Sequence, residues 1–246
     1  MKTQLVITDV TRMQEGRVCV AGYTHQRECV RPVLPHPGIH ETMLYANGKP
    51  IIFPFAVVEY DLLERVIAPP HTEDWRYDPR SVRGIKRVDE KDRRVILDRL
   101  VCPSVAAIFN AKIFSGQGHY LLIGQGERSL GTVRPKPGIE AIIEPRDDAW
   151  KYRLRFADQS DAEYRLAITD LTWRYFCDAQ KRAGTAPEKL AAELTDRLRS
   201  SQVYVRIGLA RGWDEHPARC YLQITGVYTF PDFLEGKTFA DFVSPA

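Results

Sequence analysis

Short apolar runs rich in Val and Ile, separated by Gly, Pro and polar clusters, fill most of the first 125 residues. Such runs predict β-strands joined by turns. A charged stretch that begins at Asp89 has apolar residues at helical spacing, which predicts a helix to about Leu100 and a further turn before Asn110. The strands predicted in this half cover residues 4–10, 17–23, 28–33, 53–66 and 119–124.

The second half of the chain has a clearer pattern. Residues 151–156 alternate basic and apolar side chains, which is typical of a strand with one exposed and one buried face. A helical region is predicted over residues 173–200, interrupted near Gly184, and three of its leucines share one face: Leu190, Leu194 and Leu198. The strands predicted in this half cover residues 138–144, 150–156, 163–171, 203–209 and 220–229.

Three strands, a helix and two further strands follow one another in the second half, which is the order of elements in an OB-fold, a small five-stranded barrel. The first half fits the same scheme if residues 89–110 supply the helical region between its strands. We therefore predict a mainly β chain with inserted helices that forms two tandem OB-like barrels. The expected domains are residues 1–125 and 126–234, followed by a tail, 235–246, that docks back or binds a partner. A single mixed α+β domain is the alternative.

The 246 residues are 44% hydrophobic and 27% charged, which is typical of a folded globular protein and excludes a largely disordered chain. No apolar run reaches the length of about 18 residues that a membrane span needs. The N-terminus fits a strand better than a secretory signal peptide. Five cysteines, an odd number without a repeated spacing, indicate reduced thiols and a cytoplasmic protein that does not bind membranes.

The net charge of +3 is too small to indicate a partner by itself, but the 35 basic residues are 25 Arg and 10 Lys. Guanidinium groups bind phosphates in a planar, forked geometry and stack on bases. Surface ion pairs are an equally good reason for such an excess. The basic residues form no tail or block, so a nucleic-acid site would have to be a local surface.

One such surface is predicted on the second barrel. OB barrels bind single strands across their second and third strands, where basic side chains meet phosphates and aromatic rings stack on bases. The alternating arginines also fit the solvent-exposed side of an antiparallel sheet, where such a pattern is more common. The residues expected to bind nucleic acid are Lys151, Arg153, Arg155, Arg165, Arg206, Arg211, Trp213 and Tyr221.

The densest polar cluster of the chain lies between Pro70 and Trp75. His71, Glu73 and Asp74 could supply a hydrolase with general acid–base groups. The segment also fits a structural loop in which Trp75 is largely buried and His71 lies at the rim. The sequence has no phosphate-binding glycine loop, nucleophile elbow or zinc motif. We therefore expect no catalytic residue, no metal and no cofactor.

Six strings carry a family resemblance: ITDVTRM (7–13), CVAGY (19–23), CVRPV (29–33), HTEDW (71–75), RSLGTVRPKPG (128–138) and YVRIGLARGW…CYLQITGVYTFPDFL (204–234). They resemble a prokaryotic family of dual OB-fold domain proteins found in bacterial conflict and defence loci. The resemblance implies two tandem OB domains, nucleic-acid binding without catalysis, and an operon-encoded nuclease or NTPase that supplies the chemistry. We therefore expect a non-enzymatic module that binds single-stranded nucleic acid. The alternatives are a protein–protein adaptor and the hydrolase described above.

Overall fold

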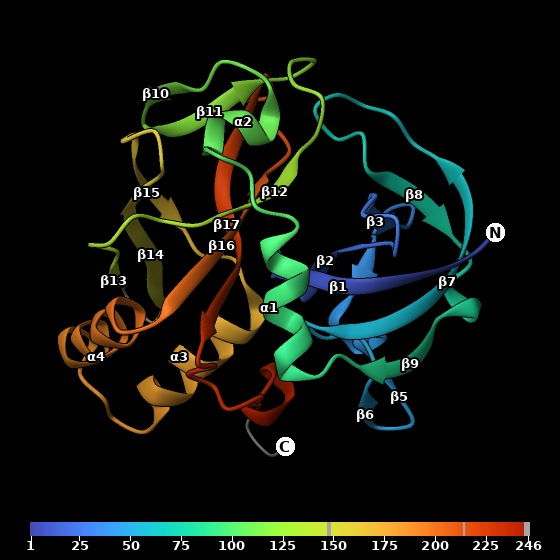
Figure 1. The fold of residues 1–246 in the computed structure, drawn as a ribbon. Helices are drawn as coiled ribbons and strands as arrows, with labels where there is room; N and C mark the ends of the chain where they lie inside the picture. Colours follow the sequence, from blue (N-terminus) through green and yellow to red (C-terminus); the bar gives the residue numbers. More distant parts are fainter. Residues whose placement is uncertain (147–148, 214, 244–246) are drawn as a thin grey trace.

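The structure, a computed structural model, describes residues 1–146, 149–213 and 215–243. Figure 1 shows two β-rich halves side by side, the first coloured from blue to cyan and the second from green to red. Helix α1 (Glu90–Asp98) runs along the seam between them. Its Leu97 is buried in a cluster with Phe55 of the first half and Tyr204 of the second. In the described part of the chain, no helix is both long and apolar enough to cross a membrane.

The first half is a closed barrel of five strands in the order β1-β2-β3-β8-β7, completed by pairing between β7 and β1. Neighbouring strands are antiparallel except β3 and β8, which are parallel. Five strands closed in this way form the OB-like barrel that the sequence predicts. The strands are β1 (Lys2–Arg12), β2 (Arg17–Tyr23), β3 (Cys29–Val33), β7 (Ala56–Arg65) and β8 (Asp74–Tyr77).

The segment between β3 and β7 contains no α-helix. Prolines within residues 32–37, and Gly38 and Gly48 at positive φ, favour turns here. The prediction that residues 89–110 join these strands is therefore wrong, because α1 and α2 (Val105–Phe109) follow the fifth strand instead. Helical spacing identifies a helix but not the strands that it connects. The remaining short elements are β4 (Ile39–His40), η1 (Glu41–Leu44), β5 (Tyr45–Ala46), β6 (Lys49–Pro50), η2 (Pro79–Ser81) and β9 (Arg83–Arg87).

The second half is an OB-like barrel whose first strand is divided. Its first part, β12, pairs with β16, and its second part, β13, pairs with β14. Pro135 and Pro137 lie between the two parts and cannot donate to a strand ladder. β14 and β15 pair antiparallel, and a parallel bridge from Ile168 to Ile224 joins the end of β15 to β17. The strands are β12 (Leu130–Val133), β13 (Glu140–Arg146), β14 (Ala149–Ala157), β15 (Glu163–Ala167), β16 (Gln202–Leu209) and β17 (Arg219–Phe230).

Two helices, α3 (Leu171–Arg182) and α4 (Pro187–Arg199), connect β15 to β16. Leu190, Leu194 and Leu198 of α4 are buried in the core of the second barrel, as their spacing predicts. α4 covers β13 at one end of this barrel. This is the place that the connecting helix of an OB-fold occupies.

A hairpin of β10 (Phe114–Gly116) and β11 (Gly118–Leu122) extends the second barrel, since β11 pairs with β17. The expected domain division at residue 125 falls just after this hairpin, whose strand pairing is with the second half. The C-terminal tail docks back through η3 (Phe239–Asp241). Phe239 is fully buried, and its ring lies 5.9 Å from that of Tyr45 in the first half.

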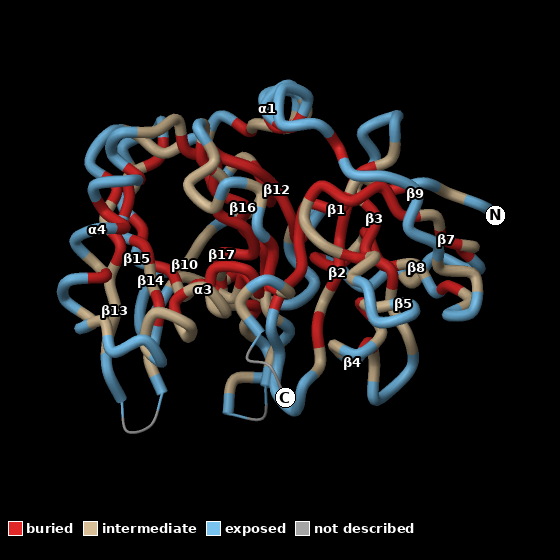
Figure 2. Tube along the Cα trace, turned by 90° about the horizontal axis from the view of Figure 1, so that it is seen from below, coloured by how far each residue is buried: buried red, intermediate tan, exposed pale blue. Residues whose placement is uncertain are grey.

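The barrels share a buried polar network where β1 meets β16 and β17, and Figure 2 shows these buried strands meeting between the two halves. Arg206 of β16 is fully buried and donates to both carboxylate oxygens of Asp9 on β1, at 2.7 to 3.1 Å. Its Nη1 donates to the Tyr23 hydroxyl and to Thr132 Oγ1, each at 2.9 Å. Arg206 therefore has no access to a ligand at the surface, contrary to the prediction, because its guanidinium serves the contact between the barrels.

Candidate functional site

The sheet face predicted to bind nucleic acid is largely charge-compensated. Arg153 lies 3.4 Å from a carboxylate oxygen of Glu144 on the neighbouring strand β13, and Arg165 pairs with the same carboxylate. Arg155 pairs with Glu140 at 2.5 Å. Lys151 is exposed and lies opposite Glu144 in the strand register. These pairs are what the solvent-exposed side of an antiparallel sheet typically carries.

A groove of about 560 Å³ lies elsewhere, between the two barrels. One wall consists of β2, β3 and the loop between β1 and β2, and the other is the start of the loop between β16 and β17. OB barrels use this strand face and these loops to hold oligonucleotides. Among the described residues, no Asp or Glu lines the groove. Its basic lining residues are Arg12, Arg17, Arg31 and Arg211.

Arg31 lies at the floor of this inter-barrel groove. The residue is 5% exposed, and its Nε donates to Oδ1 of buried Asp74 at 2.5 Å. The other oxygen of Asp74 accepts from Arg211, so two guanidinium groups share one carboxylate. The buried Nη2 of Arg31 finds no acceptor within the described residues. Because an unsatisfied buried donor costs about 1–3 kcal/mol, a ligand oxygen that reached it would be strongly favoured.

The two arginines at the rim are held more loosely. Arg12 pairs with Asp178 at 3.1 Å and Arg17 with Glu15 at 3.4 Å, and parts of all four side chains are exposed. Exposed pairs of this kind contribute little free energy, so a phosphate can replace the carboxylate at small cost. Within the part of the chain that the structure describes, the groove thus has four cations whose partners are three carboxylates.

A row of four aromatic rings, which we name the aromatic ladder, begins at the groove. Trp213 lines the groove, is 52% exposed, and stacks on Tyr221 at 5.4 Å with an interplanar angle of 16°. Tyr221 lies beside Tyr120 at 5.5 Å, and Tyr120 stacks on Phe114 at 5.6 Å. Arg219 lies over the Tyr120 ring at 4.7 Å. Rings of this kind form platforms on which bases stack.

The structure therefore brings together three of the predicted residues: Arg211, Trp213 and Tyr221. It adds others that the sequence interpretation missed, because the alternating basic residues pointed to the second barrel alone. The sequence did contain one indication of these residues. The string CVRPV places Arg31 on a predicted strand of the first barrel, on the β2–β3 face. The residues added are Arg12, Arg17, Arg31, Phe114 and Tyr120.

The polar cluster around residues 71–75 joins the barrels. Glu73 accepts hydrogen bonds from the backbone N–H groups of Ser129 and Leu130, at 2.6 and 3.2 Å, and from the Ser129 hydroxyl. His71 is 3% exposed, so the prediction of an imidazole at the rim is wrong. Its burial, together with the neighbouring guanidinium groups, lowers the pKa of His71 to about 2. Trp75 packs against the core of the first barrel with its indole Nε1 buried, in agreement with the prediction that it is largely buried.

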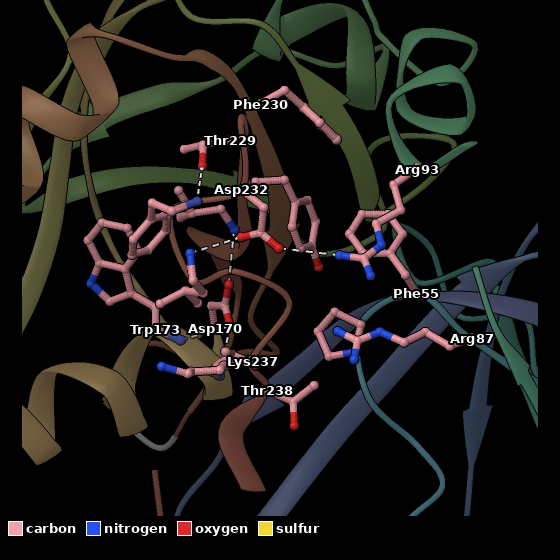
Figure 3. A pocket seen from close by; sticks show the side chains of 16 residues that line it. Phe55, Arg87, Arg93, Asp170, Trp173, Thr229, Phe230, Asp232, Lys237 and Thr238 are labelled. Carbon is pink, nitrogen blue, oxygen red and sulfur yellow. Dashed lines mark hydrogen bonds and ion pairs between the residues drawn. The ribbon is translucent and has the colours of Figure 1, made fainter. Parts of the chain in front are cut away.

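A second, smaller pocket lies between the barrels near α1 and the tail (Figure 3). Figure 3 shows Arg93 and Asp232 pointing toward one another, and their ion pair measures 3.3 Å. Asp170 accepts from the backbone N–H groups of Thr172, Trp173 and Val227. The cavity is about 40 Å³, which is room for a few waters at most. The side chains that line this pocket therefore stabilise the fold and leave little room for a ligand.

The described residues contain no group of three or more His, Cys, Asp or Glu side chains that could hold a metal ion, and all five cysteines are free thiols.

Two OB-like barrels that meet along a cationic groove define a tandem OB-fold protein. The chain belongs to the family of the dual OB-containing domain (DuOB), whose sequence model matches residues 3–227. No curated protein matches the sequence.

Proposed function

We propose that the protein binds single-stranded nucleic acid in the inter-barrel groove, without catalysing a reaction on it. The observation that carries this proposal is the meeting, in one groove, of a buried arginine with an unsatisfied donor, Arg31, and an exposed stacked ring, Trp213. The first suits a phosphate oxygen and the second suits the face of a base.

The geometry favours a single strand over a duplex. The aromatic ladder offers ring faces, and a base can stack on a ring only when it has left its own stack. The partly exposed arginines at the rim supply the attraction to phosphate that does not depend on sequence. The wall of the groove beside Arg31 includes Pro32, Val33 and Leu34, and an apolar wall of this kind suits sugars and base edges.

As the wider role, we propose that the protein acts with a partner effector, an operon-encoded nuclease or NTPase in prokaryotic defence. The support for this is membership of the dual OB-containing domain family together with the resemblance stated above. In such an arrangement, this chain supplies recognition and the partner supplies catalysis.

The test is a titration of fluorescent single-stranded DNA and RNA at two salt concentrations. Wild-type protein should bind more weakly at the higher salt. The Arg12→Ala variant should weaken binding to every sequence and flatten the salt slope by about 0.7 for the lost phosphate contact. Trp213→Ala should cost about 1–3 kcal/mol through lost stacking.

The matched control is the double variant Arg153→Ala/Arg155→Ala on the ion-paired sheet face, which should bind like the wild type. If this variant alone loses affinity, the β14–β15 face is the binding surface instead of the groove. No binding by the wild type at low salt would overturn the proposal and favour a protein–protein adaptor, whose apolar contacts are less sensitive to salt.

A further inference from the structure

The floor and the rim of the groove differ in how they can meet a phosphate. The rim residue Arg12 and the loop residue Arg211 have partly exposed side chains, whereas Arg31 at the floor is 5% exposed and its Nη2 is covered. An internal phosphodiester has a nucleoside on each side, and both would have to enter the groove for the phosphate to reach Arg31. A phosphate at the end of a strand needs only one.

We infer that Arg31 and Arg211 form a subsite for the terminal phosphate monoester of a single strand, whose end lies in the groove. This inference rests on the proposed function and specifies its ligand.

Charge supports a monoester at this position. Asp74 forms ion pairs with both Arg31 and Arg211, so these three side chains together carry a net positive charge. Asp74 is 2% exposed and its two oxygens accept from the two guanidinium groups, which limits its repulsion of an incoming anion. A phosphate monoester carries a charge of about −1.5 to −2 near neutral pH and has three acceptor oxygens. A guanidinium group binds such oxygens in a forked pair.

The position of the loop also defines which base would stack. Arg211 and Trp213 are two residues apart at the start of the β16–β17 loop, and both line the groove. A terminal phosphate on Arg211 and Arg31 therefore places the first nucleoside beside the exposed ring of Trp213. The strand would then leave along the aromatic ladder, through Tyr221 and Tyr120.

The test compares three labelled oligonucleotides of one sequence, with a 5′-phosphate, with a 3′-phosphate, or with hydroxyl groups at both ends. Wild-type protein should bind one phosphorylated form at least tenfold more tightly than the hydroxyl form, and the two phosphorylated arms identify the end that is recognised. Arg211→Ala and Arg31→Lys should abolish that preference, because the first removes a guanidinium and the second removes the fork. Arg12→Ala, at the rim, should weaken all three equally and keep the preference.

Two outcomes separate this inference from the proposed function. Equal affinities for the three oligonucleotides overturn the terminal subsite while nucleic-acid binding stands, and no binding of any overturns both. Because Arg31→Lys alters a buried pair, a second measurement uses wild-type protein alone. A nucleoside monophosphate should displace the phosphorylated oligonucleotide at lower concentration than the matching nucleoside, and equal competition would contradict the subsite.

Discussion

Arg206 and Asp9 form an ion pair between the barrels with almost no solvent exposure. Removal of one partner of such a pair leaves the other charge buried, which costs about 3–5 kcal/mol. We expect Arg206→Met to lower the free energy of unfolding by about this amount in urea denaturation. Arg155→Ala is the control, because it breaks an exposed pair with Glu140 and should cost less than about 1 kcal/mol. Equal losses in the two variants would contradict this view of the seam.

The buried imidazole of His71 makes the free energy of unfolding depend on pH. Its pKa is lowered by burial, and then by Arg31 and Arg211, to about 2 in the folded protein, whereas an unfolded histidine titrates near 6.5. Between these values the unfolded chain binds more protons, so stability is lost as the pH falls below about 6.5. Relative to His71→Gln, the wild type should therefore lose about 2 kcal/mol of unfolding free energy from pH 7 to pH 5. Urea denaturation at the two pH values measures it.

The exposed residue His25 supplies the comparison for that experiment. His25→Gln should leave the difference from wild type nearly constant between the two pH values. A constant difference for His71→Gln as well would show that its imidazole is not held in a buried, neutral state.

Residue patterns predict burial better than they predict partners. The alternation in residues 151–156 correctly separates the buried face of β14 from its charged face. Arg206 stands within the apolar run YVRIGL, and this setting was the signal that it is buried, although its residue type suggested a phosphate contact. Neither pattern could show that Arg153 and Arg165 meet Glu144, because that contact depends on the pairing of β13 with β14.

At the scale of elements, the loop between β16 and β17 carries the groove residues Arg211 and Trp213 with Gly212 between them. A Cβ at Gly212 would lie 2.1 Å from the carbonyl oxygen of Pro217, so the loop must shift to accept any side chain. We expect Gly212→Ala to move both neighbours and reduce oligonucleotide affinity by about 1–3 kcal/mol, the range for a lost stacking contact. Fluorescence titration with a single strand measures this effect.

Gly116→Ala is the matched control, since a Cβ at Gly116 meets nothing within 4 Å. It should bind like the wild type. Wild-type affinity in Gly212→Ala would mean that this loop does not shape the binding surface.

Elements of the second barrel follow from the sequence more fully than those of the first. Alternation and leucine spacing correctly identify β14, β15 and α4. The misplaced helical region at residues 89–110, and the short strand β12, depend on which distant strands pair, and local periodicity has no information on this. The hairpin of β10 and β11 joins β17 across about 100 residues of chain for the same reason.

For the whole molecule, the groove exists because two barrels are held in one arrangement. Asp9 with Arg206, and Glu73 with Ser129, tie the halves together through buried groups. One wall comes from the β2–β3 face and the other from a loop more than 170 residues away in the chain. The sequence predicted two barrels and a nucleic-acid ligand, but a site composed of both barrels requires their relative placement, which neither half encodes alone.

A single strand bound as proposed lies in the groove and on the aromatic ladder. Ultraviolet cross-linking of the full chain to a single strand, followed by mass spectrometry of the peptides, tests it most directly. We expect cross-links at Trp213, Tyr221 or Tyr120, which disappear when unlabelled single strand competes. Cross-links confined to β14 and β15, or none in conditions where binding is measured, would contradict it.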